Sequence, residues 1–296
     1  MSINLRKYND RVSKSKLSSF SFHNNDLLEL FVKRDDLIHP EVSGNKWRKL
    51  KWNLIGAVQN NCNVISTYGG AYSNHLLATA SLGYDFGIQT RAYIRGDELN
   101  QSSNALLKRC HDLNMDLRFI NRQKYFTDKR TNGISMSNED LIWNIPEGGA
   151  NKEGVEGCKE IIQETSNDFD FIFVAQGTST TSMGILSAMN PNSTLVVVPV
   201  LKGYDSIREM KWFHTEFGLE FDQSKIIVLD QFHFGGYAKS NDILIDFVEE
   251  FNQSNTFRIE PVYTGKVMYA LNHYVKSKSL MHKKVLFVHT GGLHYQ

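Results

Sequence analysis

Short apolar runs alternate along the chain with segments whose apolar residues recur at helical spacing. The apolar runs have the length of strands and no polar alternation, which is typical of strands buried on both faces. Because helices separate these strands, the sheets are expected to be parallel and covered by helices. The predicted strands are 63–67, 89–94, 117–120, 171–175, 194–200, 225–229 and 284–289, and the predicted helices are 75–82, 104–113, 153–165, a segment beginning near Met183, and 267–274. The sequence therefore predicts an α/β fold of two open, twisted, mostly parallel sheets, each flanked by helices.

The strand and helix pattern also suggests how the chain divides into domains. A chain of 296 residues is long enough for one large domain or two of medium size. We expect a small domain at 56–149 and a large domain formed by 1–55 together with 150–296. The stretch 121–140 is polar and only weakly periodic, which favours a surface excursion.

Composition and charge exclude several classes of protein. Apolar residues make up 41% and charged residues 22% of the chain, and the net charge is +1, so we expect no general attraction to nucleic acid or to a membrane surface. No apolar run approaches the ~18 residues of a spanning helix, and residues 1–7 lack the apolar segment of a secretory signal. The cysteines Cys62, Cys110 and Cys158 are widely spaced, which favours buried thiols in a reducing cytosol over disulfides or a metal site. We therefore expect a cytoplasmic protein without bound metal.

The segment 43–50, Ser-Gly-Asn-Lys-Trp-Arg-Lys-Leu, is the first candidate for chemistry. A helix can start at Ser43, Gly44 or Asn45, and its apolar stripe would be Trp47, Leu50, Leu54 and Ile55. Lys46 then lies in the first turn, where the positive end of the helix dipole lowers the pKa of a lysine and favours the neutral amine. A neutral amine is the form that attacks a carbonyl carbon. The alternative is a solvated lysine on a basic helix, since Arg48, Lys49 and Lys51 lie beside it.

Ligands bind at the carboxyl ends of strands in open α/β sheets, and loops rich in Gly, Ser, Thr or Asn occur there in this chain. The first loop, 68–75, reads Tyr-Gly-Gly-Ala-Tyr-Ser-Asn-His. Its glycines permit close backbone approach, and Ser73 or Asn74 can cap the next helix, whose free N–H groups would hold a carboxylate. The alternative is a simple capping turn.

The second loop, 176–182, reads Gln-Gly-Thr-Ser-Thr-Thr-Ser and lies between a predicted strand and a predicted helix. Five hydroxyls at a helix N-terminus indicate a phosphate cradle. The loop lacks the Gly-Lys-Ser/Thr ending of a Walker A loop and the glycine spacing of a dinucleotide fingerprint, which argues against a nucleotide-binding protein. The alternative is a polar turn with a good cap.

Two further loops offer hydroxyl groups. The loop 289–292, His-Thr-Gly-Gly, follows the last predicted strand and presents the neutral hydroxyl of Thr290. The loop 261–266, Pro-Val-Tyr-Thr-Gly-Lys, places the phenol of Tyr263 beside a glycine, ahead of an apolar helix. Taken singly, a strand-end turn and a core tyrosine explain these loops better.

A nucleophilic lysine, an anion cradle and a neutral hydroxyl at a strand end together suggest pyridoxal 5'-phosphate as a cofactor. With these residues the chain resembles the pyridoxal-phosphate enzymes of the tryptophan-synthase-β fold (fold type II), and within them the branch of the D-cysteine desulfhydrases and 1-aminocyclopropane-1-carboxylate deaminases. The matching pieces run from Lys33-Arg34-Asp35-Asp36-Leu37 and 43–50 to Thr290-Gly291-Gly292, in the order of the family. The resemblance implies a homodimer, with the cofactor in a cleft between the large and the small domain.

The resemblance also implies roles for individual residues. Lys46 corresponds to the lysine that holds the cofactor, Asn74 to the contact of the cofactor ring hydroxyl, and Thr290 to the partner of the pyridine nitrogen. The phosphate loop corresponds to Gly177, Thr178, Ser179, Thr180 and Thr181. The implied catalytic residues are Lys46, Ser73 and Tyr263, and the implied substrate-binding residues are Tyr72, Ser73, Asn74, His75 and Thr264.

Thr264 distinguishes the two activities of the branch. The cyclopropane deaminases carry a glutamate after the tyrosine, whereas the desulfhydrases carry a threonine, and ring opening without an α-proton needs acid–base help that threonine supplies poorly. The resemblance therefore implies β-elimination from a small D-amino acid, with D-cysteine giving pyruvate, hydrogen sulfide and ammonia. The alternatives are a 1-aminocyclopropane-1-carboxylate deaminase and a catalytically weak pyridoxal-phosphate-binding protein. Two departures from the family change the substrate side and leave the latter open: Tyr72 stands where the family often has Gln, and the chain ends at Gln296, so that we expect no closing C-terminal helix.

Overall fold

The strands of the chain form two sheets, each of which belongs to its own unit of the chain. The computed structural model describes residues 15–22, 27–39, 41–42, 44–165 and 168–292. As far as they are described, the first unit comprises His39–Gly157 and the second comprises Lys14–Ile38 with Cys158–Gln296. Ser43 as a possible helix start, and the expectation for the chain end after Gly292, lie outside the described residues.

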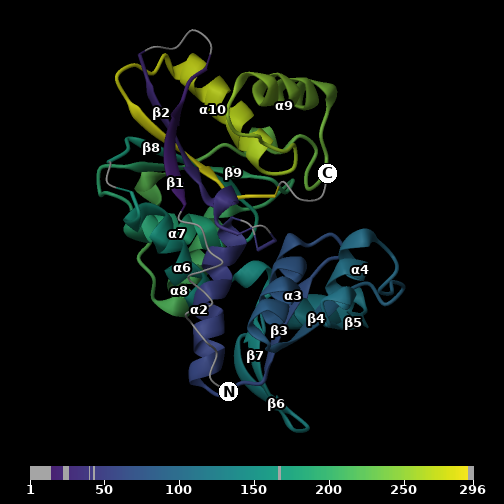
Figure 1. Ribbon diagram of the computed structural model, residues 1–296. Coiled ribbons are helices and arrows are strands. Elements are labelled where there is room, and N and C mark those ends of the chain that lie inside the picture. Colours follow the sequence, from purple (N-terminus) through teal and green to yellow (C-terminus); the bar gives the residue numbers. More distant parts are fainter. Residues whose placement is uncertain (1–14, 23–26, 40, 43, 166–167, 293–296) are drawn as a thin grey trace. The chain divides into compact units, whose positions relative to one another are not determined.

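The first unit contains a five-stranded sheet in the order β5-β4-β3-β7-β6 (Figure 1). Neighbouring strands are parallel except for β6 and β7, which form an antiparallel pair. The strands are β3 Val64–Gly69, β4 Gln89–Arg95, β5 Asp116–Ile120, β6 Gly133–Ser137 and β7 Asp140–Ile145. The helical segments are α2 Asn45–Gln59, α3 Asn74–Phe86, α4 Ala105–Asp112, α5 Arg122–Asp128, η2 Glu147–Gly149 and α6 Lys152–Gln163, the last of which continues into the second unit.

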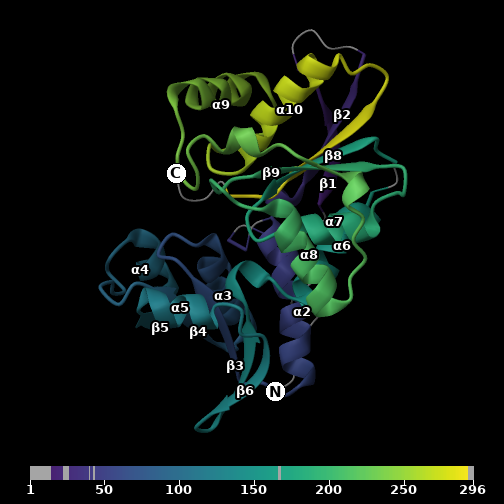
Figure 2. The ribbon, with the colours of Figure 1, turned by 180° about the vertical axis from the view of Figure 1, so that it is seen from behind.

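Alternating side chains of this sheet reach helices on its two faces. Ala92 and Ile94 of β4 pack with apolar residues of α3 and α4 on one face. Tyr93 points to the other face, where the Tyr68 ring stacks on it with 5.0 Å between the ring centroids. The Tyr68 ring also contacts the ring of Tyr125 of α5, with 6.2 Å between the centroids. The two opposite views show α4 and α5 on different sides of this sheet (Figures 1 and 2).

The second unit contains a six-stranded sheet in the order β1-β2-β11-β8-β9-β10. Its strands are parallel except for β1, which pairs antiparallel with β2. The strands are β1 Lys16–Phe20, β2 Glu29–Arg34, β8 Phe171–Gln176, β9 Thr194–Pro199, β10 Ile226–Val228 and β11 Lys284–His289. The helices are α7 Thr180–Ala188, α8 Ser206–Phe217, α9 Asp242–Ser254 and α10 Thr264–Lys278, with short segments η1 Asp35–Leu37, η3 Gln223–Lys225 and η4 Asp230–His233.

The larger core of the second unit lies between its sheet and the helices α9 and α10. Phe173 of β8 and Val196 of β9 pack there against Leu271 of α10. Ile172 and Val174 alternate with Phe173 along β8 and are also buried, so they point to the opposite face, where α7 contacts β8 and β9. The sheet is thus buried on both faces, as its uninterrupted apolar strands predicted.

The predicted fold class of two mostly parallel α/β sheets is confirmed, and so is the burial of the three cysteines. The stretch 121–140 is more than a surface excursion: it forms α5 and β6, and Tyr125 is fully buried. Helix α7 begins at Thr180 and not near Met183. The elements that the sequence pattern missed are β1, β2, α5, β6, β7, α8 and α9. The predicted domain bounds, 56–149 against 1–55 with 150–296, stay a prediction.

Candidate active site

Helix α2 places Lys46 in its first turn. The helix begins at Asn45 and follows Gly44, which has a φ of 64° that side-chain-bearing residues rarely adopt. Among the described residues no side chain caps this helix end. Buried Trp47 and Leu50 fix the inner face of the helix. Lys46 is half-buried, and its Nζ donates to Asn45 Oδ1 at 3.0 Å.

The loop between β3 and α3 presents a helix N-terminus that its own side chains leave open. Ser73 stands at the N-cap position, but within the described part of the chain its side chain makes no capping hydrogen bond. Asn74 is the first residue of α3, and Tyr72 before it is 68% exposed. Gly69 must be a glycine, because a Cβ there would lie 2.7 Å from Leu76 Cγ. The open N–H groups of α3 suit a carboxylate.

His75 lies in the first turn of α3 and is 1% exposed. Neither ring nitrogen has a hydrogen-bond partner among the residues that the structure describes. Burial lowers the pKa of His75 well below its usual value, and the positive charges of Lys46 and Lys49 lower it further. The ring is therefore neutral near pH 7 and offers one N–H donor and one acceptor. A ligand in this region would find two buried polar atoms to bind.

The N-terminus of α7 is the second open helix end. Strand β8 ends at Gln176, and Ser179 at the N-cap position has a φ of 59°. In the described structure no side chain caps α7, and the N–H of Thr180 donates to the carbonyl of Thr178 at 2.8 Å. The dipole of this helix end favours an anion there. Gln176 Nε2 donates to Ser179 Oγ at 3.0 Å, and the same Oγ lies 2.8 Å from the phenol oxygen of Tyr204. These contacts hold the loop 176–179 in place.

Buried polar atoms without partners lie at the same helix end. Gln176 Oε1 and Ser182 Oγ have no hydrogen-bond partner within the described residues. Thr180 and Thr181 of the first turn are buried, and the hydroxyls of Thr178 and Thr180 lie 3.3 Å apart. An anion at this helix end would meet several hydroxyls, which is the donor set of a phosphate cradle.

Strand β11 delivers Thr290 at the end of a buried hydrogen-bond network. His289 is fully buried; its Nε2 lies 2.7 Å from the carbonyl of Arg258, and its Nδ1 accepts from the N–H of Gly291 at 3.2 Å. Asp36 Oδ1 also lies 3.7 Å from Nδ1. Thr290 itself is 8% exposed. The position of its hydroxyl thus depends on a strand end that His289 ties to the chain before α10.

A buried carboxylate organises the start of α10. Glu260 is 2% exposed, and its Oε1 accepts from the N–H groups of Tyr263 and Thr264 at 2.9 and 2.8 Å. Its Oε2 accepts from Val262 at 2.6 Å. The hydroxyl of Thr264 donates to Glu260 Oε1 at 3.0 Å and accepts from the N–H of Glu260 at 2.9 Å. Thr264 is fully buried, and in this structure its hydroxyl takes part in the hydrogen bonds at the start of α10.

Tyr263 lies between the phosphate-type loop and a second tyrosine. A Cβ at Gly177 would lie 3.8 Å from Tyr263 Cε1, which places the ring against this loop. The rings of Tyr263 and Tyr237 meet edge to face at 5.9 Å, and their phenols are hydrogen-bonded. A Cβ at Gly292 would lie 3.6 Å from the Glu260 carboxylate. The second unit therefore brings together Gly177, Tyr263, Thr264 and the loop after Thr290.

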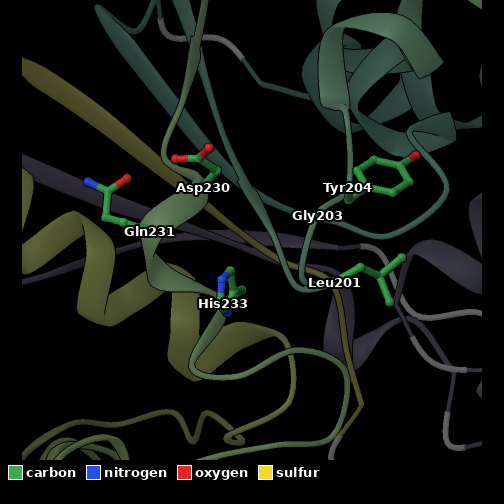
Figure 3. Close-up of a pocket in the computed structure, with 6 residues that line it drawn as sticks. All are labelled: Leu201, Gly203, Tyr204, Asp230, Gln231 and His233. Atoms are coloured by element: carbon green, nitrogen blue, oxygen red, sulfur yellow. The ribbon is translucent and has the colours of Figure 1, made fainter.

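A cavity of about 210 Å³ lies beyond the carboxyl ends of β9 and β10. One side is formed after β9 and the other by η4 (Figure 3). Tyr204 lines it and also bonds to Ser179, so the cavity adjoins the cradle at α7. Its lining residues are Leu201, Gly203, Tyr204, Asp230, Gln231 and His233.

A model of the family described as pyridoxal-phosphate dependent enzyme matches residues 16–291. The chain belongs to this family. A putative 1-aminocyclopropane-1-carboxylate deaminase of Thermotoga maritima is 28% identical, over 89% of this chain and 88% of its own length. A mitochondrial bifunctional D-cysteine desulfhydrase/1-aminocyclopropane-1-carboxylate deaminase of Arabidopsis thaliana is 29% identical, over 90% and 72%. A crystal structure of an ACC deaminase homologue shares the fold, with a TM-score of 0.77 and 21% identity over 98% of this chain and 94% of that one.

The residues of this pyridoxal-phosphate enzyme fit the cofactor. The open end of α7 has the hydroxyls and the orphaned buried atoms that a phosphate group would satisfy. Lys46 provides an amine in the other unit, near neutral His75. In the described residues no group of His, Cys, Asp or Glu side chains could hold a metal ion, and no helix there is long and apolar enough to cross a membrane.

Several residues of the candidate site escaped the sequence reasoning. Glu260 could have been found, because an acidic residue shortly before a helix is a capping signal. Tyr237 follows two glycines, which is only a weak signal. Lys266 and His289 carry no signal, since their partners are backbone groups distant in the sequence.

Proposed function

We propose that this enzyme removes the β-substituent and the amino group of a small D-amino acid, and that D-cysteine is its substrate. The products are pyruvate, hydrogen sulfide and ammonia, with one water consumed. What carries the proposal is the combination of a first-turn lysine on α2 with a hydroxyl-lined, open helix end at α7. That combination supplies an amine for the cofactor aldehyde and a cradle for its phosphate.

Different residues of this chain have different roles in the proposed reaction. Pyridoxal phosphate, when bound, supplies an aldehyde that condenses with amines and a ring that withdraws electrons from Cα. Lys46 holds the cofactor and, when its amine is free, takes the proton from the substrate Cα. Residues 177–181 would bind the phosphate, Asn74 would bind the ring hydroxyl, and the neutral hydroxyl of Thr290 would bond to the ring nitrogen. Ser73 and the open N–H groups of α3 bind the substrate carboxylate, with Tyr72 and His75 beside it.

Tyr263 and Thr264 bear on the choice of substrate. The ring of Tyr263 lies against the phosphate loop at Gly177, which supports a role for its phenol in exchanging a proton with the leaving group. Position 264 offers a hydroxyl and no carboxylate, and this hydroxyl is bonded to Glu260. Both oxygens of Glu260 accept from backbone N–H groups, so that carboxylate is engaged in capping. Elimination of hydrosulfide needs no further acid–base group, whereas ring opening does.

A second candidate is 1-aminocyclopropane-1-carboxylate deamination. Both relatives are named for this activity, and the protein of Arabidopsis thaliana is also named for D-cysteine desulfhydrase. The two candidates use the same cofactor and the same lysine. They differ in whether the substrate has an α-proton, so a direct comparison of substrates separates them. The homodimer implied by the resemblance stays a prediction, and so does the cytoplasmic location expected from the cysteines and the N-terminal residues.

A substrate panel tests the proposal. Purified holoenzyme would be assayed for keto-acid release from D- and L-amino acids and from the cyclopropane acid, with K46A as the blank for protein-independent release. We expect D-cysteine to be consumed at least ~10²-fold faster than the cyclopropane acid, the lower limit for a missing acid–base group. A preference for the cyclopropane acid would overturn the substrate assignment. Release from none of these substrates would favour a protein that only binds the cofactor.

A further inference from the structure

The loop 233–237 connects η4 to Tyr237 through an unusual backbone. Phe234, Gly235 and Gly236 have successive φ values of 50°, 91° and 118°. Glycine adopts such φ values freely, whereas Phe234 keeps its positive φ only where the surroundings determine it. The rings of Phe232 and Phe234 pack on Tyr269 of α10, which anchors the start of the loop. The other end of the loop, next to Tyr237, must be held by other contacts.

Lys266 of α10 makes these contacts. The side chain is fully buried, and its Nζ donates to the carbonyl of His233 at 2.9 Å and to that of Gly236 at 2.7 Å. Burial lowers the pKa of Lys266 to about 8, against the opposing effect of the negative charge on Glu260. Burying an ammonium is costly, and an apolar side chain of similar length would fill the same space without that cost. The bonds to the loop are what a lysine adds here.

The loop end that Lys266 holds carries a phenol of the candidate site. Tyr237 directly follows Gly236, and its phenol is hydrogen-bonded to that of Tyr263. Burial raises the pKa of Tyr237; the bond with Tyr263 lowers it, and the charge of Glu260 raises it. Tyr263 in turn lies against Gly177 of the phosphate loop. A chain of contacts therefore runs from Lys266 to the ring beside the cofactor cradle.

We propose that Lys266 is a positioning residue that fixes the loop 233–237 and so holds the Tyr237 phenol against that of Tyr263. The proposal rests on the proposed function, because it assigns Tyr263 to the reaction site. Lys266 itself touches neither substrate nor cofactor in this role. It acts through the orientation of two phenols.

The ionisation of Tyr237 gives a test that needs no turnover. In holoenzyme, the tyrosinate absorbance would be titrated with and without Y237F, so that the difference reports Tyr237 alone. In the K266M background we expect the pKa of Tyr237 to fall toward the ordinary value of about 10, because the released phenol reaches solvent. Loss of a positive charge alone would raise that pKa. An unchanged or raised pKa in K266M would therefore overturn the proposal.

Two further variants keep the test decisive. K276M removes an exposed lysine from the last turn of the same helix and should leave the titration of Tyr237 unchanged. G236A strains the loop at a φ of 118° without altering Lys266, and should lower the pKa of Tyr237 as K266M does. If K266M does not fold, G236A decides: an unchanged titration means that the loop does not control Tyr237.

Turnover supplies the second readout. We expect K266M and Y237F each to lower kcat by tenfold or more with little change in KM, and the double variant to be no worse than Y237F alone within twofold. Additive losses would show that Lys266 does not act through Tyr237. Absence of turnover in the wild type would count against the proposed function, while the tyrosine titration would still decide the role of Lys266.

Discussion

At the scale of single residues, two buried side chains of the candidate site, Glu260 and Lys266, bond to backbone groups. Glu260 accepts hydrogen bonds from three backbone N–H groups at the start of α10. Lys266 donates to two backbone carbonyls of a loop about thirty residues away in the sequence. Each charge is satisfied by backbone, so each fixes the path of the chain next to a proposed site residue. Thr264 belongs to the first of these arrangements through its bonds to Glu260.

A carboxylate placed at position 264 should therefore conflict with Glu260. In T264E two buried carboxylates would lie within hydrogen-bond reach, so the pKa of the pair must rise. The folded state then binds more protons than the unfolded state between about pH 4.5 and the raised pKa, and stability falls as the pH rises through that window. A rise of one to two pKa units corresponds to about 1.4–3 kcal/mol.

The uncharged variant T264Q, of equal length, is the matched control. Chemical denaturation at several values between pH 5 and pH 8 should show T264E losing stability relative to T264Q as the pH rises. Parallel stability curves for the two variants would mean that Glu260 and position 264 are not in contact. The same pair of variants, assayed with D-cysteine and the cyclopropane acid, shows whether a carboxylate at this position narrows the substrate preference.

At the scale of elements, the inner strands could be predicted because their sequences are uninterrupted apolar runs, as in 171–175 and 194–200. Strand β2 has charged residues at both ends, and its buried Lys33 pairs with Glu164, which no local pattern reveals. Helix α9 is different: its buried residues Leu244, Val248 and Phe251 have helical spacing, so the sequence did contain the signal.

The candidate loops could be found for a related reason. Their chemistry lies in contiguous residues, as in the hydroxyl run 178–182, and contiguous residues can be read from a sequence. The contacts that hold those loops join distant segments, such as Ser179 with Tyr204 or Lys266 with Gly236. Such pairs follow from the tertiary fold, so sequence reasoning could name the loops and not their supports.

The open end of α7 should lose cofactor affinity when its hydroxyls are removed. In T178V/T181V the phosphate would lose two charge-assisted hydrogen bonds, each worth about 1.5–3 kcal/mol before compensation. We expect Kd for pyridoxal phosphate to rise at least tenfold, measured by equilibrium binding to the apoprotein. T215V removes an exposed hydroxyl of α8, which bonds to Lys211, and should leave Kd unchanged. An effect within twofold in T178V/T181V would place the phosphate elsewhere.

At the scale of the whole molecule, each unit has its own sheet, its own core and its own share of the proposed site residues. The first contributes Lys46 on α2 and the loop 72–75, and the second contributes the loops that follow β8 and β11 and precede α10. In both units these segments lie at the carboxyl ends of parallel strands or at open helix ends, which is where α/β proteins bind ligands.

One amine of the whole chain should hold the cofactor. Helix α2 carries Lys46, Lys49 and Lys51 within two turns, but the Nζ of Lys49 donates to the carbonyl of Gly148, and that of Lys51 lies 5.8 Å from the Trp52 ring. Lys46 is the one in the first turn of the helix, near the neutral ring of His75.

Borohydride reduction of the loaded protein, followed by peptide mapping, should therefore place the cofactor on Lys46 with one label per chain. K46A should lose both the label and turnover, the latter by at least ~10²-fold, because it removes the anchor and the base together. K51A is the control from the same helix and should keep both. A label on Lys49 or Lys51 in the wild type, or turnover retained in K46A, would mean that another group holds the cofactor.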